Sequence, residues 1–465
     1  MGTDNLQTCG LATAGIDVTQ LIDRRGLSWL LIGCLALCTL VTLVDGYNIS
    51  VVAFAAPAIS KDWGLSRGSL GPLFSSSLLA GLIGPYLFGM LADRRGRRHA
   101  VIISVLVIGV FGLLSGVCTS LSSLVAARFI AGIGMSGALA VAVATINEFA
   151  PRRLRATFVT VVFSGTTIGS GLPGLLAAPL LAHAGWRALL FIGGAMPLLL
   201  AVVVYRFLPE SPKFLCLNPG RHAQLAALLR RFEPQLSLDG TERFRLADEV
   251  NPERSSYAQL FSGKLAWLTP LLWFGSFVAM IDFQALNSWL PTLLTDAGVS
   301  FQRASLAVVL FQFVGTLGGW AVMRPVDAFG MLPCTILYAL GIPAVASLGL
   351  VPGGAVNPLW VCALAGFCLL GLHFAQVSCV SSIYPTSIRG RGVGWFLLVG
   401  RAGGAVGPAV VGVLVGRHLG VSTIFYLTAI PLAAGVVASI AVTLVYRKLH
   451  FEKTDAGVDA GLVRA

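Results

Sequence analysis

The sequence carries little charge for its length. Of its 465 residues, 11% are Asp, Glu, Lys or Arg and 56% are hydrophobic, and the mean hydropathy is +0.84. Water-soluble domains carry about 25% charged and about 45–50% apolar residues. The shortage of charge therefore excludes an ordinary soluble enzyme and predicts an integral membrane protein with many spans.

Motifs for catalysis and metal binding are also missing. The nine cysteines form no Cys-x-x-Cys pair, so we expect neither a disulfide framework nor a metal site. The 54 glycines follow no Gly-x-y period, which excludes collagen. No nucleophile–base arrangement and no phosphate-binding loop with a lysine occurs. The sequence predicts a protein that is not an enzyme and that needs no cofactor.

Long apolar runs recur along the whole chain. One crossing of a bilayer takes about 20 apolar residues. The polar segment 1–26 precedes a first run that is too long for the apolar core of a cleaved signal. The runs predict twelve spans, at 27–59, 69–91, 99–119, 121–147, 156–181, 186–207, 265–295, 302–323, 331–350, 358–384, 391–418 and 422–447.

The positive charges behind the net charge of +12 are divided unevenly between the two predicted sides of the membrane. With an inner N-terminus, 25 of the 32 Lys and Arg residues fall on the inner side. The outer side holds only Lys61, Arg67, Arg187, Arg303 and Arg417, and the remaining two, Arg128 and Arg401, lie within spans. The positive-inside rule then places both termini in the cytoplasm. The excess of basic residues is thus explained by the topology in the membrane, and it does not indicate a nucleic acid partner.

The two halves of the chain repeat at an offset of 234 residues. An offset that covers an even number of spans makes the duplication parallel. The matched pairs are Pro57 and Pro291, Asp93 and Asp327, Gly96 and Gly330, Pro151 and Pro385, and Arg155 and Arg389. We expect a cytoplasmic tail (1–26), a six-helix bundle (27–207), a cytoplasmic linker (208–264), a second six-helix bundle (265–447) and a C-terminal tail (448–465). In the linker, the stretch 233–254 is either a short amphipathic helix or, as we favour, a solvated tether.

A basic loop with one acid joins the second and third predicted spans. Such an acid can pair with an arginine or cap a helix N-terminus and so latch one conformation; the alternative is a positive-inside loop with an incidental acid. The latch residues would be Gly89, Asp93, Arg94, Gly96 and Arg97. The pattern G-x-x-x-D-R-x-G-R-R resembles the signature loop of the major facilitator superfamily. That resemblance implies an all-α fold of twelve transmembrane helices in two parallel six-helix bundles.

Three further stretches carry a narrower resemblance. They are Leu43–Asn48 (LVDGYN), Arg128–Gly134 (RFIAGIG) and Tyr384–Pro408, which contains Gly400-Arg401-Ala402-Gly403. Together they resemble the aromatic acid:proton symporter family over nearly the whole chain. The resemblance implies proton-coupled import of an aromatic carboxylate, such as a hydroxybenzoate, across the bacterial inner membrane by alternating access.

Other functions remain open from sequence alone. The same fold serves importers of non-aromatic organic anions and exporters of drugs or metabolites. A sensor that signals without carrying flux would need a long cytoplasmic domain, whereas the linker has only about 57 residues. We expect the protein to act as a monomer with protons, a small carboxylate and the bilayer as its partners.

Asp45 and Arg401 are the principal site candidates among the few ionisable residues inside the spans. Such residues usually face a cavity or a partner, because charge at the bilayer centre is costly. Asp45 is the predicted proton carrier, with an ion pair to Arg128 as the alternative. Arg401 is the predicted ligand of the substrate carboxylate, because guanidinium binds carboxylate bidentately; the alternative is a buried pair with Asp282 or Asp45.

One residue departs from the family pattern. The family usually has a second acid three residues after the first, on the same helix face, and here that residue is Asn48. Asn48 falls at the repeat position of Asp282. We expect Asp282 to replace the missing acid across the cavity, and Asn48 to contact substrate.

Three more ionisable residues are candidates for proton coupling. Arg128 either relays protons, pairs with Asp45 or reaches toward the outer surface. Glu148 lies where the fourth span ends, beside a run of arginines, so a structural salt bridge is the alternative. His373 is either a proton site or a hydrogen-bonded histidine of the helix interior.

Aromatic side chains for the substrate ring are harder to single out. Phe and Trp occur throughout the spans, and most face lipid or the core. From this set we expect only Tyr47, Phe283 and Trp395 to contact the ring.

Overall fold

The computed structural model describes residues 16–23, 28–232, 244–246, 257–263, 265–385 and 388–445. Most of the predicted N-terminal tail, nearly all of the 233–254 stretch of the linker and the C-terminal tail lie outside the described residues.

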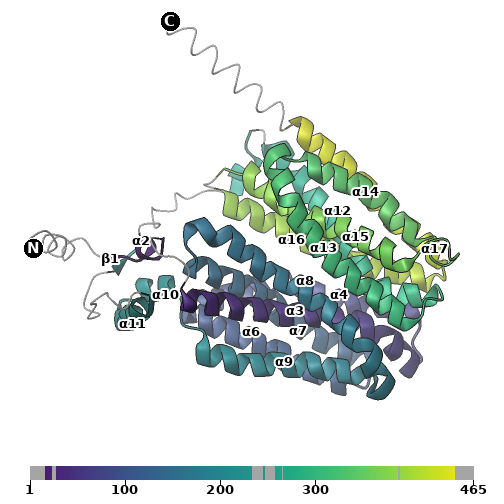
Figure 1. Ribbon diagram of the computed structural model, residues 1–465, viewed down its shortest axis with the longest axis horizontal. Coiled ribbons are helices and arrows are strands. Elements are labelled where there is room, and N and C mark those ends of the chain that lie inside the picture. The colour runs from purple at the N-terminus through teal and green to yellow at the C-terminus, as the bar shows by residue number, and fades with distance from the viewer. Residues whose placement is uncertain are drawn as a thin grey trace, which may run out of the picture.

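Two bundles of long apolar helices lie side by side (Figure 1). In the described chain, eleven helices are long and apolar enough to span a membrane, and α14 is a shorter apolar helix. The N-terminal bundle holds α3 (Trp29–Asp62), α4 (Gly71–Ala80), α5 (Gly84–Arg95), α6 (Arg97–Val117), α7 (Leu121–Phe149), α8 (Arg155–His183) and α9 (Gly185–Phe207). The C-terminal bundle holds α12 (Leu265–Asp296), α13 (Phe301–Phe329), α14 (Leu332–Leu348), α15 (Pro358–Ile383), α16 (Arg389–Gly416) and the span Val421–Val445, which begins with α17 (Val421–Thr428). The predicted all-α fold of twelve spans is confirmed, with bounds within a few residues of those expected.

The second span differs from its prediction as a single helix. It is broken by a turn at residues 81–83 into α4 and α5, and it is preceded by the 3-10 helix η1 (Arg67–Leu70). Pro85, in the first turn of α5, has no N–H group and cannot continue the hydrogen-bond ladder of α4. At the break, therefore, some backbone groups of this span lack the hydrogen-bond partner that a continuous helix would give them.

The parallel repeat is visible in the packing. The first span packs on the fifth (α3 on α8), as the seventh does on the eleventh (α12 on α16). The close backbone contacts repeat at the offset of 234 residues. Gly169 meets the backbone at Leu43, and Gly403 meets the backbone at Phe277. Small residues that let two helix backbones touch are typical of helix contacts in membranes.

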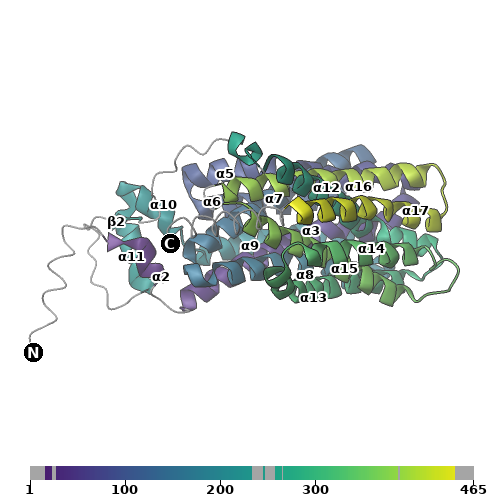
Figure 2. The same ribbon diagram turned by 90° about the horizontal axis from the view of Figure 1, so that it is seen from above.

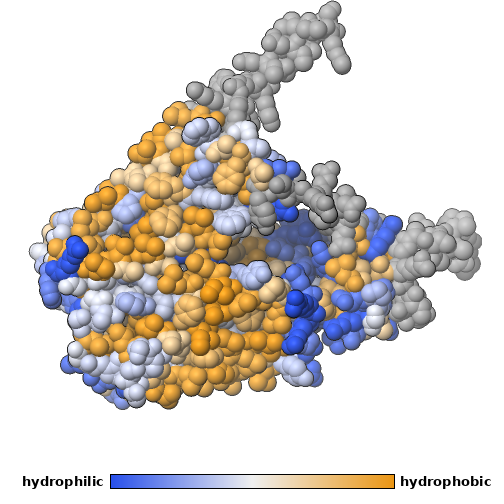
Figure 3. All heavy atoms as spheres, turned by 180° about the vertical axis from the view of Figure 1, so that it is seen from behind, coloured by the Kyte–Doolittle hydropathy of each residue, from blue (hydrophilic) through white to orange (hydrophobic). Residues whose placement is uncertain are grey.

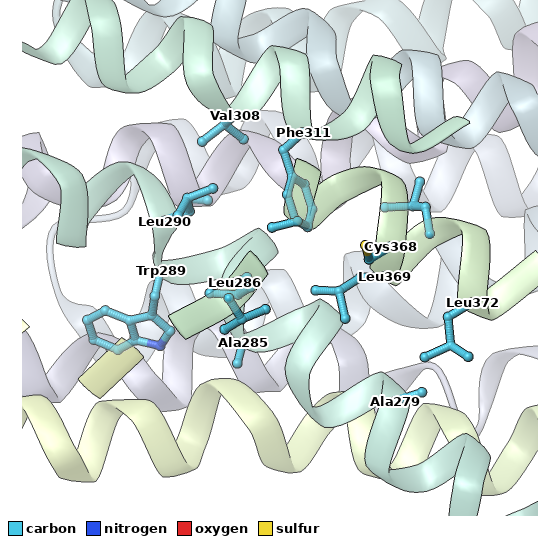
Figure 4. Close-up of a cluster of buried hydrophobic side chains, with 14 of the residues drawn as sticks. Ala279, Ala285, Leu286, Trp289, Leu290, Val308, Phe311, Cys368, Leu369 and Leu372 are labelled. Atoms are coloured by element: carbon cyan, nitrogen blue, oxygen red, sulfur yellow. The ribbon is translucent and has the colours of Figure 1, made fainter. Parts of the chain in front are cut away.

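Buried aromatic and aliphatic side chains fill the C-terminal bundle where α12, α13 and α15 meet (Figure 4). Trp289 and Phe311 are fully buried there. Large apolar side chains also lie on the outer surface of the helices. Trp267 and Trp360, for example, are 74% and 75% exposed. The face in Figure 3 is accordingly a broad apolar band over the helices. An apolar outside of this extent fits a lipid environment.

Short elements gather at one end of the molecule, which we call the linker end (Figure 2). They are β1 (Ile16–Asp17), α2 (Val18–Asp23), the 3-10 helix η2 (Arg152–Leu154), α10 (Pro212–Leu217), η3 (Pro219–Arg221), α11 (His222–Phe232), β2 (Phe244–Arg245) and η4 (Tyr257–Phe261). β1 and β2 form a two-stranded parallel sheet. The described helices of the linker, α10, η3, α11 and η4, all lie outside the 233–254 stretch considered above.

The opposite end, which we call the far end, is closed between the bundles. Arg67 and Asp296 form an ion pair across it at 2.8 Å. The rings of Phe74 and Trp289 meet edge to face, with centroids 5.1 Å apart. Toward the linker end, by contrast, Figure 3 shows a hollow between the bundles, lined by hydrophilic residues. This arrangement is a conformation closed at the far end.

Candidate functional site

A cavity of about 170 Å³ lies between the two bundles. The N-terminal bundle contributes residues of α3, α4 and α7, and the C-terminal bundle contributes residues of α12 and α16. Much of its wall is apolar, formed by Ile49, Val52, Leu73, Phe74, Met135 and Met280. A cavity of about 150 Å³ is enough to take up benzene. This cavity therefore has room for one six-membered ring.

Asp45 faces this cavity from α3. It is 1% exposed, and neither of its carboxylate oxygens has a hydrogen-bond partner among the described residues. Arg401 lines the same cavity. The alternative ion pair with Arg128 is not formed, because Arg128 contacts Asn48 instead. A buried carboxyl without a partner is suited to gaining and losing a proton.

Arg401 enters the cavity from α16 of the other bundle. Its Nη1 donates a hydrogen bond to the backbone carbonyl of Gly81, at 2.8 Å. Neither of the expected alternatives, a salt bridge to Asp282 or to Asp45, is present in the described chain. Gly404, one turn further along, also lines the cavity and leaves room beside the guanidinium group. The arginine thus brings a positive charge into a cavity whose wall is mostly apolar and which also holds Asp45.

Tyr47 and Asn48 point into the N-terminal bundle and do not line this cavity. The Tyr47 hydroxyl donates to the carbonyl of Leu189 at 3.0 Å, and the Asn48 amide donates to the carbonyl of Gly193 at 2.8 Å. Arg128, fully buried, donates to the side-chain and backbone oxygens of Asn48. In this conformation these residues join α3, α7 and α9 within one bundle, and their contact with substrate stays a prediction.

Asp282 is also placed away from the cavity. It lies on α12, three residues after Ala279 and three before Ala285, and both of these alanines belong to the packed cluster of Figure 4. It is fully buried, and its carboxylate oxygens have no hydrogen-bond partner in the part of the chain that the structure describes. Asp282 does not line the cavity in this conformation, so its replacement of the acid missing at Asn48 stays a prediction.

The remaining candidates in the C-terminal bundle are not cavity residues. Phe283 stacks on Phe311 with centroids 6.0 Å apart, and Trp395 stacks on Trp273 at 5.6 Å. His373, on α15, is also absent from the cavity wall, and its Nδ1 has no hydrogen-bond partner among the described residues. His373 therefore stays a candidate for proton coupling, while the two aromatic residues serve packing in this conformation.

Glu148 and the predicted latch loop form a polar cluster at the linker end. Arg97 bridges Asp93 at 3.2 Å and Glu148 at 3.1 Å, and the Ser211 hydroxyl donates to Glu148. Glu148 thus takes the structural salt bridge that was the alternative to proton coupling. The partner is Arg97 of the loop.

The loop turns at Gly96, whose φ of +100° favours glycine. The carboxylate of Glu210 sits against that turn and accepts from the backbone N–H of Arg98 at 3.1 Å, near the start of α6. Of the other latch residues, Gly89 has open space around it and Arg94 lies in the last turn of α5. All these contacts stay within the N-terminal half and the linker, so a latch between the bundles remains a prediction.

Several cavity residues were not singled out by sequence. Phe74, Met135 and Met280 supply ring-facing surface, and Gln284 and Ser288 supply polar groups on the α12 side. These three are uncharged apolar residues among many in the spans, so nothing in the sequence marked them in advance. A polar residue two positions after Asp282 was the available signal for Gln284.

The comparisons with known proteins agree with the resemblance seen in the motifs. Residues 35–380 match the family model of the Major Facilitator Superfamily. The chain is 34% identical over 440 residues to a gallate transporter of Pseudomonas putida, which covers 92% of this chain and 95% of the relative. It is 35% identical over 401 residues to the 4-hydroxybenzoate transporter PcaK of the same organism, covering 84% and 88%. Among solved structures, the xylose transporter XylE from E. coli, in a partially occluded inward-open conformation, has a TM-score of 0.67 at 18% identity and covers 89% of this chain and 97% of that one.

Proposed function

Because the chain belongs to the major facilitator superfamily, and within it to the family of aromatic acid transporters, we propose that it imports an aromatic carboxylate such as a hydroxybenzoate together with a proton. The relatives are transporters and not enzymes. No cofactor enters the proposal, since the proton gradient supplies the driving force.

One observation carries the proposal. The two halves of the chain bring one acid, Asp45, and one arginine, Arg401, to the wall of a single cavity that is otherwise mostly apolar and of ring size. Arginine binds a carboxylate in a planar, bidentate geometry. Methionine sulfur and aromatic edges, here Met135, Met280 and Phe74, make favourable contacts with an aromatic ring. Gln284 and Ser288 are placed to bind a ring hydroxyl group.

The same geometry supports proton coupling. A charged Asp45 repels a substrate carboxylate in the shared cavity, and a proton on Asp45 removes this repulsion. Proton and anion therefore favour one another's binding, and the coupling is reciprocal. Loss of the proton on the low-proton side would then help to expel the substrate. Rocking of the two bundles would expose the cavity first at the far end and then at the linker end.

We further propose that the linker end faces the cytoplasm of a bacterial inner membrane. The excess of Lys and Arg at the linker end supports this orientation through the positive-inside rule. Transport needs only one chain in this scheme, so the proposed functional unit is a monomer.

The test is uptake of labelled 4-hydroxybenzoate into proteoliposomes under an inward proton gradient. Wild-type protein is expected to accumulate the label, and excess gallate is expected to compete. Arg401→Ala should lower uptake by at least tenfold, because hydrogen bonds to charged groups contribute about 1.5–3 kcal/mol, and Arg401→Lys should keep part of it. Arg303→Ala, an exposed arginine outside the cavity, is the matched control and should transport normally. Folded wild-type protein that takes up no aromatic acid would refute the proposal and favour another organic anion or an exported compound.

A further inference from the structure

The break in the second span leaves one carbonyl oxygen without its helical donor. In an α-helix the carbonyl of residue 81 accepts from the N–H of residue 85. Residue 85 is proline, which has no N–H. The backbone bonds recorded at the break run from Gly81 N to Leu78 O and from Ile83 N to Ala80 O, both at 3.0 Å. Among the described backbone hydrogen bonds outside the helices, none uses the Gly81 carbonyl.

Arg401 supplies the missing donor. Its Nη1 lies 2.8 Å from the Gly81 oxygen, although the two residues are 320 positions apart and belong to different bundles. Both residues line the ring-sized cavity. A hydrogen bond from a guanidinium group to a carbonyl is charge-assisted and directional. The contact therefore ties one end of the planar fork and leaves its other N–H groups free to bind an anion.

We propose that the Gly81 carbonyl, left open by Pro85, is the positioning group that orients Arg401 for the substrate carboxylate. The inference rests on the proposed function and adds Gly81 and Pro85 to the residues that decide affinity. Pro85 acts only through the carbonyl that it leaves unoccupied, and neither residue needs to touch the substrate.

The contact also links the site to the state of the far end. Gly81 and Arg401 are carried by the same pair of spans whose backbones touch further out, where Gly71 packs on Gly412. Separation of these spans would pull the carbonyl away from the arginine. The carboxylate site is therefore complete only while the far end is closed, so binding of the acid favours closure.

The experiment compares binding of 4-hydroxybenzoate and 4-hydroxybenzamide to purified protein. Pro85→Ala restores an N–H that competes for the Gly81 carbonyl. We expect it to weaken binding of the acid about tenfold, which is the loss of one well-placed hydrogen bond to a charged group. Binding of the neutral amide should change little. Pro343→Ala, an exposed proline inside α14, is the matched control and should change neither. Equal losses for acid and amide, or no loss for either, would overturn the inference.

A second measurement does not depend on the substrate. Unfolding temperatures of the wild type, Pro85→Ala, Arg401→Ala and the double variant form a cycle. We expect the effect of Pro85→Ala to be clearly smaller when Arg401 is already absent. Additive effects would refute the contact. Wild-type protein that binds no hydroxybenzoate would instead refute the proposed function, and the cycle would then decide on the contact alone.

Discussion

At the scale of residues, the rarity of ionisable side chains inside the spans was the most informative property of the sequence. Asp45 and Arg401 stand out because ionisable side chains inside spans are few and costly, and the structure brings both to one cavity. Their roles remain predictions. For Tyr47 and Asn48, the sequence gives their spacing along the helix but not the groups that each side chain contacts. Arg128 of α7 donates hydrogen bonds to Asn48 of α3, and this contact holds Asn48 inside the N-terminal bundle.

The aromatic residues of the cavity, in contrast, could not be identified from sequence. Phe283 and Trp395 are common residue types in membrane helices, and each stacks on a neighbour outside the cavity. Phe74, which does line the cavity, looks no different in sequence. Residue type alone therefore does not single out the apolar residues that line the cavity.

At the scale of elements, apolar length predicted the spans but not their breaks. Pro57, Pro173 and Pro291 lie inside continuous helices, whereas Pro85 begins a new one. Neighbouring helices decide which prolines interrupt a span, because they can satisfy the freed backbone groups. The hydrogen bond from Arg401 to the Gly81 carbonyl satisfies such a freed backbone group, and its donor comes from the other bundle.

The repeated glycine contacts lead to a prediction about helix packing. Gly169→Ala and Gly403→Ala each place a Cβ against the backbone of the facing span, at equivalent positions of the two halves. Each substitution is expected to lower the free energy of unfolding by about 1–3 kcal/mol through overpacking. Gly394→Ala, where a Cβ meets open space in α16, is the control and should be neutral or slightly stabilising. Thermal unfolding in detergent measures all three, and equal effects at Gly394 and Gly403 would contradict the packing argument.

At the scale of the whole molecule, the repeat was the strongest long-range signal in the sequence. A constant offset predicted two parallel bundles, and the same helix pairs and glycine contacts recur in both. Which end is closed could not be predicted, because a transporter sequence encodes more than one packing of its bundles. The ion pair of Arg67 with Asp296 and the Phe74–Trp289 contact describe one of these states.

Cys118 reports the orientation of the molecule in the membrane. It follows α6 at the far end and is partly exposed, while the other cysteines in the described ranges are buried. With the linker end in the cytoplasm, a membrane-impermeant maleimide should label Cys118 in right-side-out vesicles. Cys118→Ser should remove that label. Labelling of Cys118 only in inverted vesicles would reverse the proposed topology.

The measurement that tests the central claim most directly separates proton coupling from substrate binding at Asp45. Proteoliposomes with wild-type protein or Asp45→Asn are assayed for gradient-driven accumulation of labelled 4-hydroxybenzoate and for exchange of labelled against unlabelled acid without a gradient. Asparagine cannot carry a proton or repel the anion, so Asp45→Asn is predicted to lose accumulation and to keep exchange, while Arg401→Ala loses both. Accumulation by Asp45→Asn at the wild-type level would contradict the assignment of Asp45 as the proton carrier.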